Sequence, residues 1–495
     1  MLETIMRKGG DGVASDPMIQ NDQAFQIETE GIGIIAPSKR HGTPKELFFV
    51  WFAAVLTFTG VIIGQLFTAL GLNVWESLVA AVLCSISFAI LGWASATGPK
   101  SGTVTLTTSR AAFGIKGNVV PAFFSWLSAV GWEAVTMVLT VYALLSLSQI
   151  MGGPGSGTVP TIIALIVAIA LTYIVPLFGH ATVVLMQRIL AYALAVSGVL
   201  LLIGVIPHVN WGFAPSVKSM AADGPFPTFV LALSIGLIST VWGWTNFAAD
   251  YSRYLPKDTP SKQIVWFTFL GGGIASFIVM SLGILLGTFI NAKAYAQNPV
   301  LAITHAVPAW AVVPFLVVVI LGDVTANYLN SYSSGMSFLS MGIRMKRYLA
   351  VIVDAAICTL IALYALFISP GFVNFFENFL SLNILVIGPW TAIYLVYYWM
   401  YKGQYHSADL VDSSPRSAYW YSGGVNWRAL IALFVGAFAT FWTVNSALWV
   451  SPLSTHWFGG ADLSAYFGPV FTGLLFFILM RNSSQELSVM QAKAQ

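Results

Sequence analysis

The chain has 495 residues, of which 57% are hydrophobic and only 8% are charged, whereas a soluble globular domain carries about 25% charged residues. Its 22 Lys and Arg residues nearly balance its 19 Asp and Glu residues, which excludes the dense basic face that nucleic-acid binding requires. Cys84 and Cys358 both lie in apolar runs, which excludes a disulfide framework and a cysteine metal cluster. The composition therefore indicates an integral membrane protein and argues against a soluble enzyme.

Residues 1–45 form a polar segment with interspersed Gly and Pro, without the apolar core and small-residue cleavage site of a secretory signal. We expect this segment to be a cytoplasmic N-terminal tail. Residues 482–495 are expected to form a cytoplasmic C-terminal tail.

Between these tails lie twelve apolar segments on the scale of a membrane-spanning helix, which takes roughly 20 residues to cross about 30 Å of hydrocarbon. The segments are continuous and lack the alternating polarity of barrel strands. The predicted spans are residues 47–70, 75–97, 121–147, 161–178, 189–206, 228–248, 264–290, 309–333, 349–368, 379–400, 429–448 and 466–480. The sequence therefore predicts an all-α integral membrane protein.

The basic residues predict the orientation of these spans, because cytoplasmic loops carry an excess of Lys and Arg. With the N-terminus inside, all 22 Lys and Arg residues except Lys218 and Lys293 fall on the cytoplasmic side, and none lies within a span. We therefore expect both termini in the cytoplasm and the chain in the plasma or inner membrane.

Three acidic residues, Glu133, Asp323 and Asp354, lie within predicted spans, where a carboxyl group is costly and a functional role is the default interpretation. Asp354 is close to a basic cluster at 344–347, which favours a structural role in which its side chain reaches these groups. Glu133 and Asp323 have no basic partner in any span and must be protonated, hydrogen-bonded, or beside water or substrate.

Spans 1 and 6 carry polar and Gly-rich interruptions at mid-depth, at residues 57–60 and 239–246. Interruptions at corresponding positions five spans apart predict two inverted repeats, residues 46–210 and 228–400, with discontinuous helices that meet at a central site. Residues 428–481 then contain two further spans. Close helix packing is the alternative interpretation of these small residues.

Three tryptophans, Trp132, Trp242 and Trp244, lie inside spans and away from the membrane interfaces where Trp usually anchors. Packing alone explains a single buried Trp. Beside polar groups, however, indole faces can stack on a planar heterocycle while the polar side chains bind its edge.

Several stretches also carry a family resemblance, namely SRAAFGIKGNVVPAF, GWEAVT, GWTNFAADYSRYLP, ANYLNSYSSGMS and GGADLSAYFGPV. With these motifs the chain resembles the nucleobase:cation symport family, and within it the purine and cytosine permeases, over about residues 47–480. The string DYSRYLP at 250–256 is the most specific of them. The resemblance implies a fold of the leucine-transporter type, with two inverted five-helix repeats and two extra helices.

The resemblance also implies a substrate site. The substrate-stacking Trp of span 3 corresponds to Trp132, the aromatic residue of span 6 to Trp244 with Trp242 as the alternative, and the amide of span 8 to Asn327. The unwound part of span 1 corresponds to residues 57–60, which include Phe58 and Thr59.

Two departures from the family pattern concern the substrate and the coupling ion. Thr136 stands where relatives usually have Asn or Gln, and Glu133 follows the Trp directly, where its carboxylate could accept from ring N–H groups or carry a proton. The Ser-Thr pair of sodium-coupled relatives is absent from residues 321–325. We therefore predict proton coupling through Glu133 or Asp323, with no metal site and no organic cofactor.

The charged string after span 6, which includes Asp250 and Arg253, is interpreted as solvated interface charge or as a salt-bridge gate. His180 and the other histidines lie in or beside loops and receive no role.

These features predict a secondary active symporter that is not an enzyme. It would import a purine or pyrimidine base such as cytosine, adenine, guanine or hypoxanthine, or a related planar heterocycle, with a proton and by alternating access. The alternatives are a sodium-coupled symporter of a vitamin or of a hydantoin- or allantoin-like compound, and an amino-acid or amine transporter of the same fold. The predicted partners are a small nucleobase-like molecule and the lipid bilayer.

Overall fold

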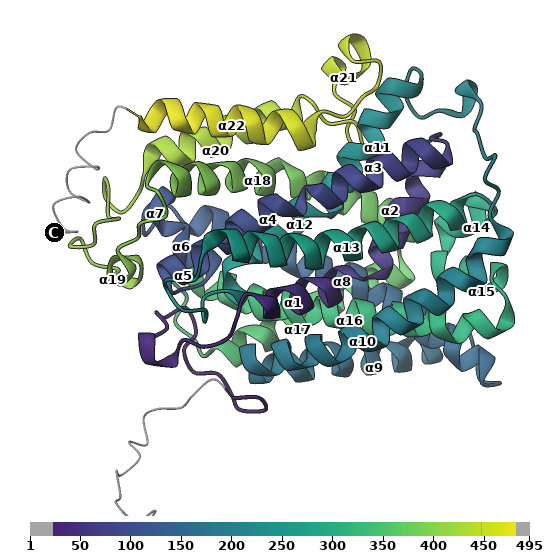
Figure 1. The fold of residues 1–495 in the computed structure, drawn as a ribbon, viewed down its shortest axis with the longest axis horizontal. Coiled ribbons are helices and arrows are strands. Elements are labelled where there is room, and N and C mark those ends of the chain that lie inside the picture. Colours follow the sequence, from purple (N-terminus) through teal and green to yellow (C-terminus); the bar gives the residue numbers. More distant parts are fainter. Residues whose placement is uncertain (1–22, 370, 447, 482–495) are drawn as a thin grey trace, which may run out of the picture.

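The protein is a bundle of helices (Figure 1). Its computed structural model describes residues 23–369, 371–446 and 448–481. Its long apolar helices, single or in consecutive pieces, are α1 (Lys45–Val55) with α2 (Phe58–Ala69), α3 (Val74–Ile86) with α4 (Phe88–Ser95) and α5 (Thr97–Ser101), α8 (Val119–Ile150), α9 (Thr158–Phe178), α10 (His180–Val205), α11 (Pro225–Ser239) with α12 (Val241–Trp244) and η4 (Thr245–Tyr251), α13 (Ser261–Gly287), α16 (Ala309–Ser340), α17 (Arg347–Phe367), α18 (Phe372–Met400), α20 (Trp427–Phe441) and α22 (Ser464–Met480). The short helices are η1 (Pro37–Lys39), α6 (Thr105–Thr108), α7 (Arg110–Phe113), η2 (Ile206–His208), η3 (Val217–Ser219), α14 (Ala292–Gln297), α15 (Pro299–Ala306), α19 (Ser407–Val411) and α21 (Pro452–Trp457).

Each predicted span coincides with one of these long helical units. Within the described residues, nine helices are long and apolar enough to cross a membrane, or ten if α1 and α2 together form one span. The last two units, α20 and α22, are shorter apolar helices. The all-helical fold is therefore as expected, whereas the number of twelve membrane crossings stays a prediction, as do the boundaries of the two repeats.

Several helix boundaries differ from the prediction: α16 ends at Ser340 and α18 begins at Phe372, each seven residues beyond the expected span, and two further differences are larger or have a visible cause. Helix α10 begins at His180, so Arg188 lies inside a helix that was expected to start after it. The Arg188 side chain is half-exposed and comes within 3.8 Å of Glu46, which gives the charge a partner. Helix α20 ends at Phe441, because the chain turns there and forms a β-bridge between Asn445 and Val450.

The interruptions predicted in spans 1 and 6 are present as breaks in the helical backbone. Helices α1 and α2 are bent by 60° at Leu56 and Thr57, and Thr57 has an extended backbone with φ −112° and ψ 161°. Helix α11 ends at Thr240, where φ is −95° and ψ is −96°, and the chain continues as the short α12 and η4. Such breaks free backbone groups in the interior of the bundle, where only protein, water or a ligand can pair with them.

Helices α2 and α13 pack with their backbones in direct contact. A side chain at Gly64 would overlap the carbonyl of Met280, and one at Gly283 would overlap the carbonyl of Val61. Glycine at both positions therefore permits an approach that no other residue allows.

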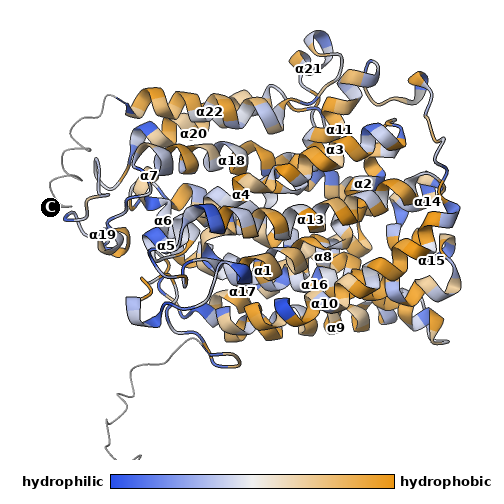
Figure 2. Cartoon of the chain, viewed as in Figure 1, coloured by the Kyte–Doolittle hydropathy of each residue, from blue (hydrophilic) through white to orange (hydrophobic). Residues whose placement is uncertain are grey.

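Figure 1 shows α18, α20 and α22 together on one side of the bundle, while α9, α10 and α17 lie on the opposite side. Residues 23–44 and the last residues of α22 lie at the same end, which also holds α5 and α6. Hydrophobic residues predominate along the long helices (Figure 2), as expected for helices that face lipid.

Candidate functional site

A small cavity of about 30 Å³ lies where the two broken helical units meet. Its walls come from both breaks and from α8, α13 and α16, and are formed by Val55, Thr57, Thr59, Gly60, Trp132, Thr136, Ser239, Thr240, Trp244, Ser276, Val279, Met280, Ala326 and Asn330. Of the predicted site residues, Thr59, Trp132, Thr136 and Trp244 are thus brought together around one space. We call it the central cavity.

The two indoles of the central cavity are held by other aromatic rings. Trp132 is 7% exposed and meets Phe379 edge-on, with ring centroids 5.1 Å apart. Trp244 meets Trp51 edge-on at 5.8 Å. Trp242, the alternative to Trp244, points elsewhere, since its indole N–H donates to the carbonyl of Ala465 at 3.1 Å.

The amide at the cavity wall is Asn330, one helical turn beyond the predicted Asn327. The Asn327 side chain accepts from Thr136 Oγ1 at 2.6 Å and donates to the Glu133 carbonyl at 3.3 Å. Asn330 Nδ2 donates to Asn327 Oδ1 at 3.3 Å, and Asn330 Oδ1 is buried without a hydrogen-bond partner among the described residues. Asn327 therefore supports Asn330, and the free acceptor that lines the cavity belongs to Asn330.

Glu133 does not line the central cavity, contrary to the prediction that it contacts the ligand. Successive residues of an α-helix point about 100° apart, so the residue after Trp132 faces α9. There its carboxylate accepts a hydrogen bond from Tyr173 at 2.5 Å, and the side chain is fully buried.

Asp354 is held by two neutral donors and not by the basic cluster next to it. Trp126 Nε1 donates to its carboxylate at 2.6 Å and Ser334 Oγ at 2.5 Å. Arg347, one of the expected partners, instead donates to the carbonyls of Pro176 and Leu177. The structural role of Asp354 fits these contacts, but the predicted basic partners were wrong.

Asp323 lies at the break between α1 and α2. Its Oδ1 accepts the backbone N–H of Phe58 at 3.2 Å, in the first turn of α2, while Oδ2 is buried and has no partner in the part of the chain that the structure describes. The N-terminus of a helix favours an acceptor of this kind. The Phe58 ring packs against Phe315 at 5.5 Å and does not line the cavity, unlike its neighbour Thr59.

Asp250 and Arg253 are buried and bind separate partners, so the interpretation as solvated interface charge was wrong. Asp250 Oδ1 accepts from the backbone N–H and the hydroxyl of Thr105, at 2.8 and 2.7 Å. Arg253 donates to the Gly31 carbonyl at 2.6 Å and to Glu28 at 2.5 Å. The two residues are thus not a salt bridge with each other.

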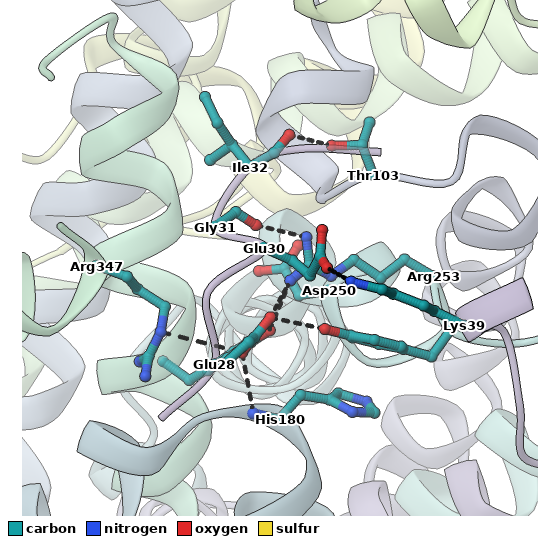
Figure 3. Close-up of polar contacts among 12 residues, drawn as sticks. Glu28, Glu30, Gly31, Ile32, Lys39, Thr103, His180, Asp250, Arg253 and Arg347 are labelled. Atoms are coloured by element: carbon teal, nitrogen blue, oxygen red, sulfur yellow. Dashed lines mark hydrogen bonds and ion pairs between the residues drawn. The ribbon is translucent and has the colours of Figure 1, made fainter. Parts of the chain in front are cut away.

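Glu28 is the centre of this network, which closes the end of the bundle that holds residues 23–44 (Figure 3). Its carboxylate accepts from Arg253 at 2.5 Å, from Tyr254 at 2.8 Å, from Tyr332 at 3.1 Å and from the backbone N–H of His180 at 3.1 Å. Burial by itself raises the pKa of this carboxyl, but the nearby guanidinium groups of Arg253 and Arg347 outweigh that effect and hold the pKa below its usual value.

Neither Glu28 nor His180 was identified from the sequence. Glu28 lies in a segment interpreted as a tail, and the His180 ring, interpreted as a loop residue, stacks on Tyr254 with centroids 4.2 Å apart. The mixed polar sequence around Glu28 has no periodicity that could have predicted its burial.

Comparison with known proteins decides the family. A family model described as a permease for cytosine/purines, uracil, thiamine and allantoin matches residues 34–464. The chain belongs to this permease family. The family resemblance inferred from the motifs is thereby confirmed, and so is the expectation of a membrane transporter and not an enzyme.

Individual relatives agree with this assignment. The permease is 28% identical to the putative purine-cytosine permease YxlA of Bacillus subtilis over 92% of this chain and 96% of that protein. It is 26% identical to the vitamin B6 transporter TPN1 of Saccharomyces cerevisiae over 75% of this chain and 65% of that protein. The structure of Mhp1, a nucleobase-cation-symport-1 family transporter in a closed conformation with bromovinylhydantoin bound, matches with a TM-score of 0.73 and 20% identity over 92% of this chain and 95% of that one. This last similarity confirms the predicted fold class.

Proposed function

We propose that the permease is a secondary active symporter that imports a purine or pyrimidine base, or a related planar heterocycle, together with a proton. The observation that carries this proposal is the juxtaposition of Trp132, Trp244 and the free Asn330 Oδ1 around one cavity. Indoles offer stacking surfaces to a flat ring, and an unpartnered amide oxygen accepts from its N–H edge.

The small volume of the central cavity supports alternating access. Ligand sites usually have volumes of about 300–1,000 Å³. A central cavity of about 30 Å³ is therefore contracted, and a heterocycle can enter only when the surrounding helices separate. Rigid movement of one helix bundle against another around a central site is the usual way in which such folds open.

The first break supports proton coupling through Asp323. Its buried Oδ2 has no partner, and a buried carboxyl group without a cation is favoured in its protonated form. Nearby, Thr325 Oγ1 donates to the Ala53 carbonyl at 3.0 Å, so this carbonyl oxygen is already paired within the protein. Glu133, the other predicted carrier, lies away from the cavity and is assigned a structural contact with Tyr173.

Two alternatives differ in their support. The relative that transports vitamin B6 favours a pyridine-type vitamin as the second candidate substrate, since it too is a planar ring. An amino-acid substrate is disfavoured, because the Phe58 N–H at the start of α2 is paired with Asp323 and does not await a carboxylate.

We also propose that the chain lies in the plasma or inner membrane with residues 23–44 on the cytoplasmic side. The excess of Lys and Arg in the loops of that side supports this orientation.

The substrate proposal is tested by uptake of labelled cytosine into proteoliposomes, with competition by unlabelled bases, vitamins and hydantoins. Base stacking on an aromatic side chain contributes about 1–3 kcal/mol, so Trp132→Ala and Trp244→Ala should each weaken affinity roughly 5- to 150-fold. Trp75→Ala is the matched control, since Trp75 is 65% exposed and contacts the ring of Trp211, away from the central cavity. Unchanged affinity in a well-folded Trp132→Ala protein would refute the stacking role.

The coupling proposal is tested by changing the proton and sodium gradients that could drive uptake. Uptake should rise as the external pH falls, stop with a protonophore, and continue when choline replaces sodium. Asp323→Asn should abolish accumulation but retain exchange of internal for external substrate. Strict sodium dependence with a flat pH profile would contradict proton coupling.

A further inference from the structure

A second and much larger cavity, of about 330 Å³, lies between α11, α18 and the chain between α20 and α22. It lies toward the end of the bundle away from residues 23–44, where Figure 1 shows α11 and α21. Its volume falls within the range of about 300–1,000 Å³ that is usual for ligand sites. We call it the distal cavity.

The walls of the distal cavity are mainly apolar. Leu231, Ile235 and Ile238 follow one face of α11, and Leu380 and Ile384 face them from α18. Walls of this kind suit the flat apolar faces of a heterocycle and leave the few polar groups to decide which ligand binds.

Glu377 supplies a carboxylate to this cavity. Within the described part of the chain this carboxylate has no hydrogen bond or ion pair. Asp462 also lines the cavity, but its carboxylate accepts from Ser234 Oγ at 3.1 Å and from the backbone N–H groups of Asn445 and Ser464 at 3.1 and 2.7 Å. Glu377 is therefore the carboxylate here that is left for a ligand.

The distal cavity adjoins the central one through the same two helices. On α11, Ile238 lines the distal cavity and the next residue, Ser239, lines the central cavity. On α18, Phe379 packs against Trp132, whereas Glu377 and Leu380 line the distal cavity. Helix α18 thus packs against the wall of the central cavity with one face and lines the distal cavity with another.

We propose that the distal cavity is a first binding station for amino-substituted heterocycles, which Glu377 holds before they reach the central cavity. A carboxylate only accepts hydrogen bonds, and it pairs best with two parallel N–H donors. A ring N–H beside an exocyclic amine, as at the N1–H and 2-amino group of guanine, provides such a pair. A base that lacks this amine, such as hypoxanthine, does not. The inference rests on the proposed function, and it narrows the substrate class.

The test uses Ser381→Cys as a reporter, because Ser381 lines the distal cavity. The native Cys84 and Cys358 are fully buried, so the background reaction with a methanethiosulfonate reagent should be slow. In the purified full-length protein, guanine should slow labelling of the reporter in a saturable way, and hypoxanthine at the same concentration should not.

Glu377→Gln in the reporter protein should raise the half-protecting concentration of guanine by roughly tenfold or more, because a charged acceptor is lost. Asp223→Asn is the matched control, since Asp223 is an exposed acid at the same end of the bundle and should leave protection unchanged. Equal protection by guanine and hypoxanthine, or protection that Glu377→Gln leaves intact, would overturn the proposal.

A third variant separates this proposal from the proposed function. In Trp244→Ala, which should lose high-affinity uptake, guanine should still protect the reporter. Loss of protection there would mean that the reporter responds to the central cavity, and would overturn the distal station alone. Failure of cytosine uptake in the wild-type protein would instead contradict the proposed function, whatever the labelling result.

Discussion

Removal of the Glu28 carboxylate should release residues 23–44 from the end of the bundle. The Arg253 side chain is fully buried and the Glu28 side chain is 3% exposed, so Glu28→Ala leaves a buried guanidinium without its counter-ion. Breaking a buried ion pair by removing one partner costs about 3–5 kcal/mol. Since about 1.4 kcal/mol corresponds to a factor of ten, the population in which this segment is detached should rise by roughly two to four orders of magnitude.

The same segment offers a matched control. Glu30 pairs with Lys39 at 2.6 Å, but their side chains are 25% and 21% exposed, and an exposed pair contributes only about 0–1 kcal/mol. Glu30→Ala should therefore change the detached population by at most about fivefold.

Hydrogen exchange of the purified protein measures this difference. Two backbone amides report on the segment, since residue 28 donates to the Phe178 carbonyl at 2.7 Å and Ile35 donates to the Gly102 carbonyl at 2.9 Å. Both amides should exchange far faster in Glu28→Ala than in Glu30→Ala. Equal exchange in the two variants would refute the reasoning that Glu28 holds this end closed.

Three further results are expected. The pKa of the Glu28 carboxyl is held below its unfolded value of about 4.3. The stability that this carboxylate contributes is therefore complete above that pH, and it is lost as the pH falls through the lower folded-state pKa. Exchange of the two reporter amides, corrected for intrinsic rates, should stay constant from about pH 8 to 6 and rise only in acid. Asn330→Leu should change the order of preferred bases in the competition assay, because it removes the Oδ1 acceptor at the central cavity, and an unchanged order would exclude Asn330 from substrate recognition. Glu133→Gln should leave the affinity for cytosine unchanged but lower the thermal stability, since it weakens the buried contact with Tyr173, and a large loss of affinity would return Glu133 to the site.

The fold could be predicted from the sequence because the bilayer leaves few choices. A backbone in hydrocarbon must pair its own polar groups, so long apolar segments become helices, and polar interruptions such as residues 57–60 become breaks. The motif around Trp132 likewise predicted one wall of the central cavity, which Trp132 lines.

The directions of side chains were harder to predict. Glu133 is one position away from Trp132, and Asn327 is one helical turn away from Asn330, and it is Trp132 and Asn330 that line the cavity. An uncertainty of this size in helix register decides whether a side chain faces the cavity or a neighbouring helix. The Glu28 network was beyond reach for a different reason. Its partners Arg253 and Tyr332 are separated from it by more than 200 residues, and no local pattern encodes such a contact.

The glycine contact between α2 and α13 constrains how the molecule can move. Where two backbones touch, with Gly64 against Met280 and Gly283 against Val61, neither helix can slide or rotate without a steric clash. The two helices should therefore move together as one rigid body. The bending needed to open the central cavity is then left to the non-helical backbone at Thr57 and Thr240, which would serve as the hinges of the transport cycle.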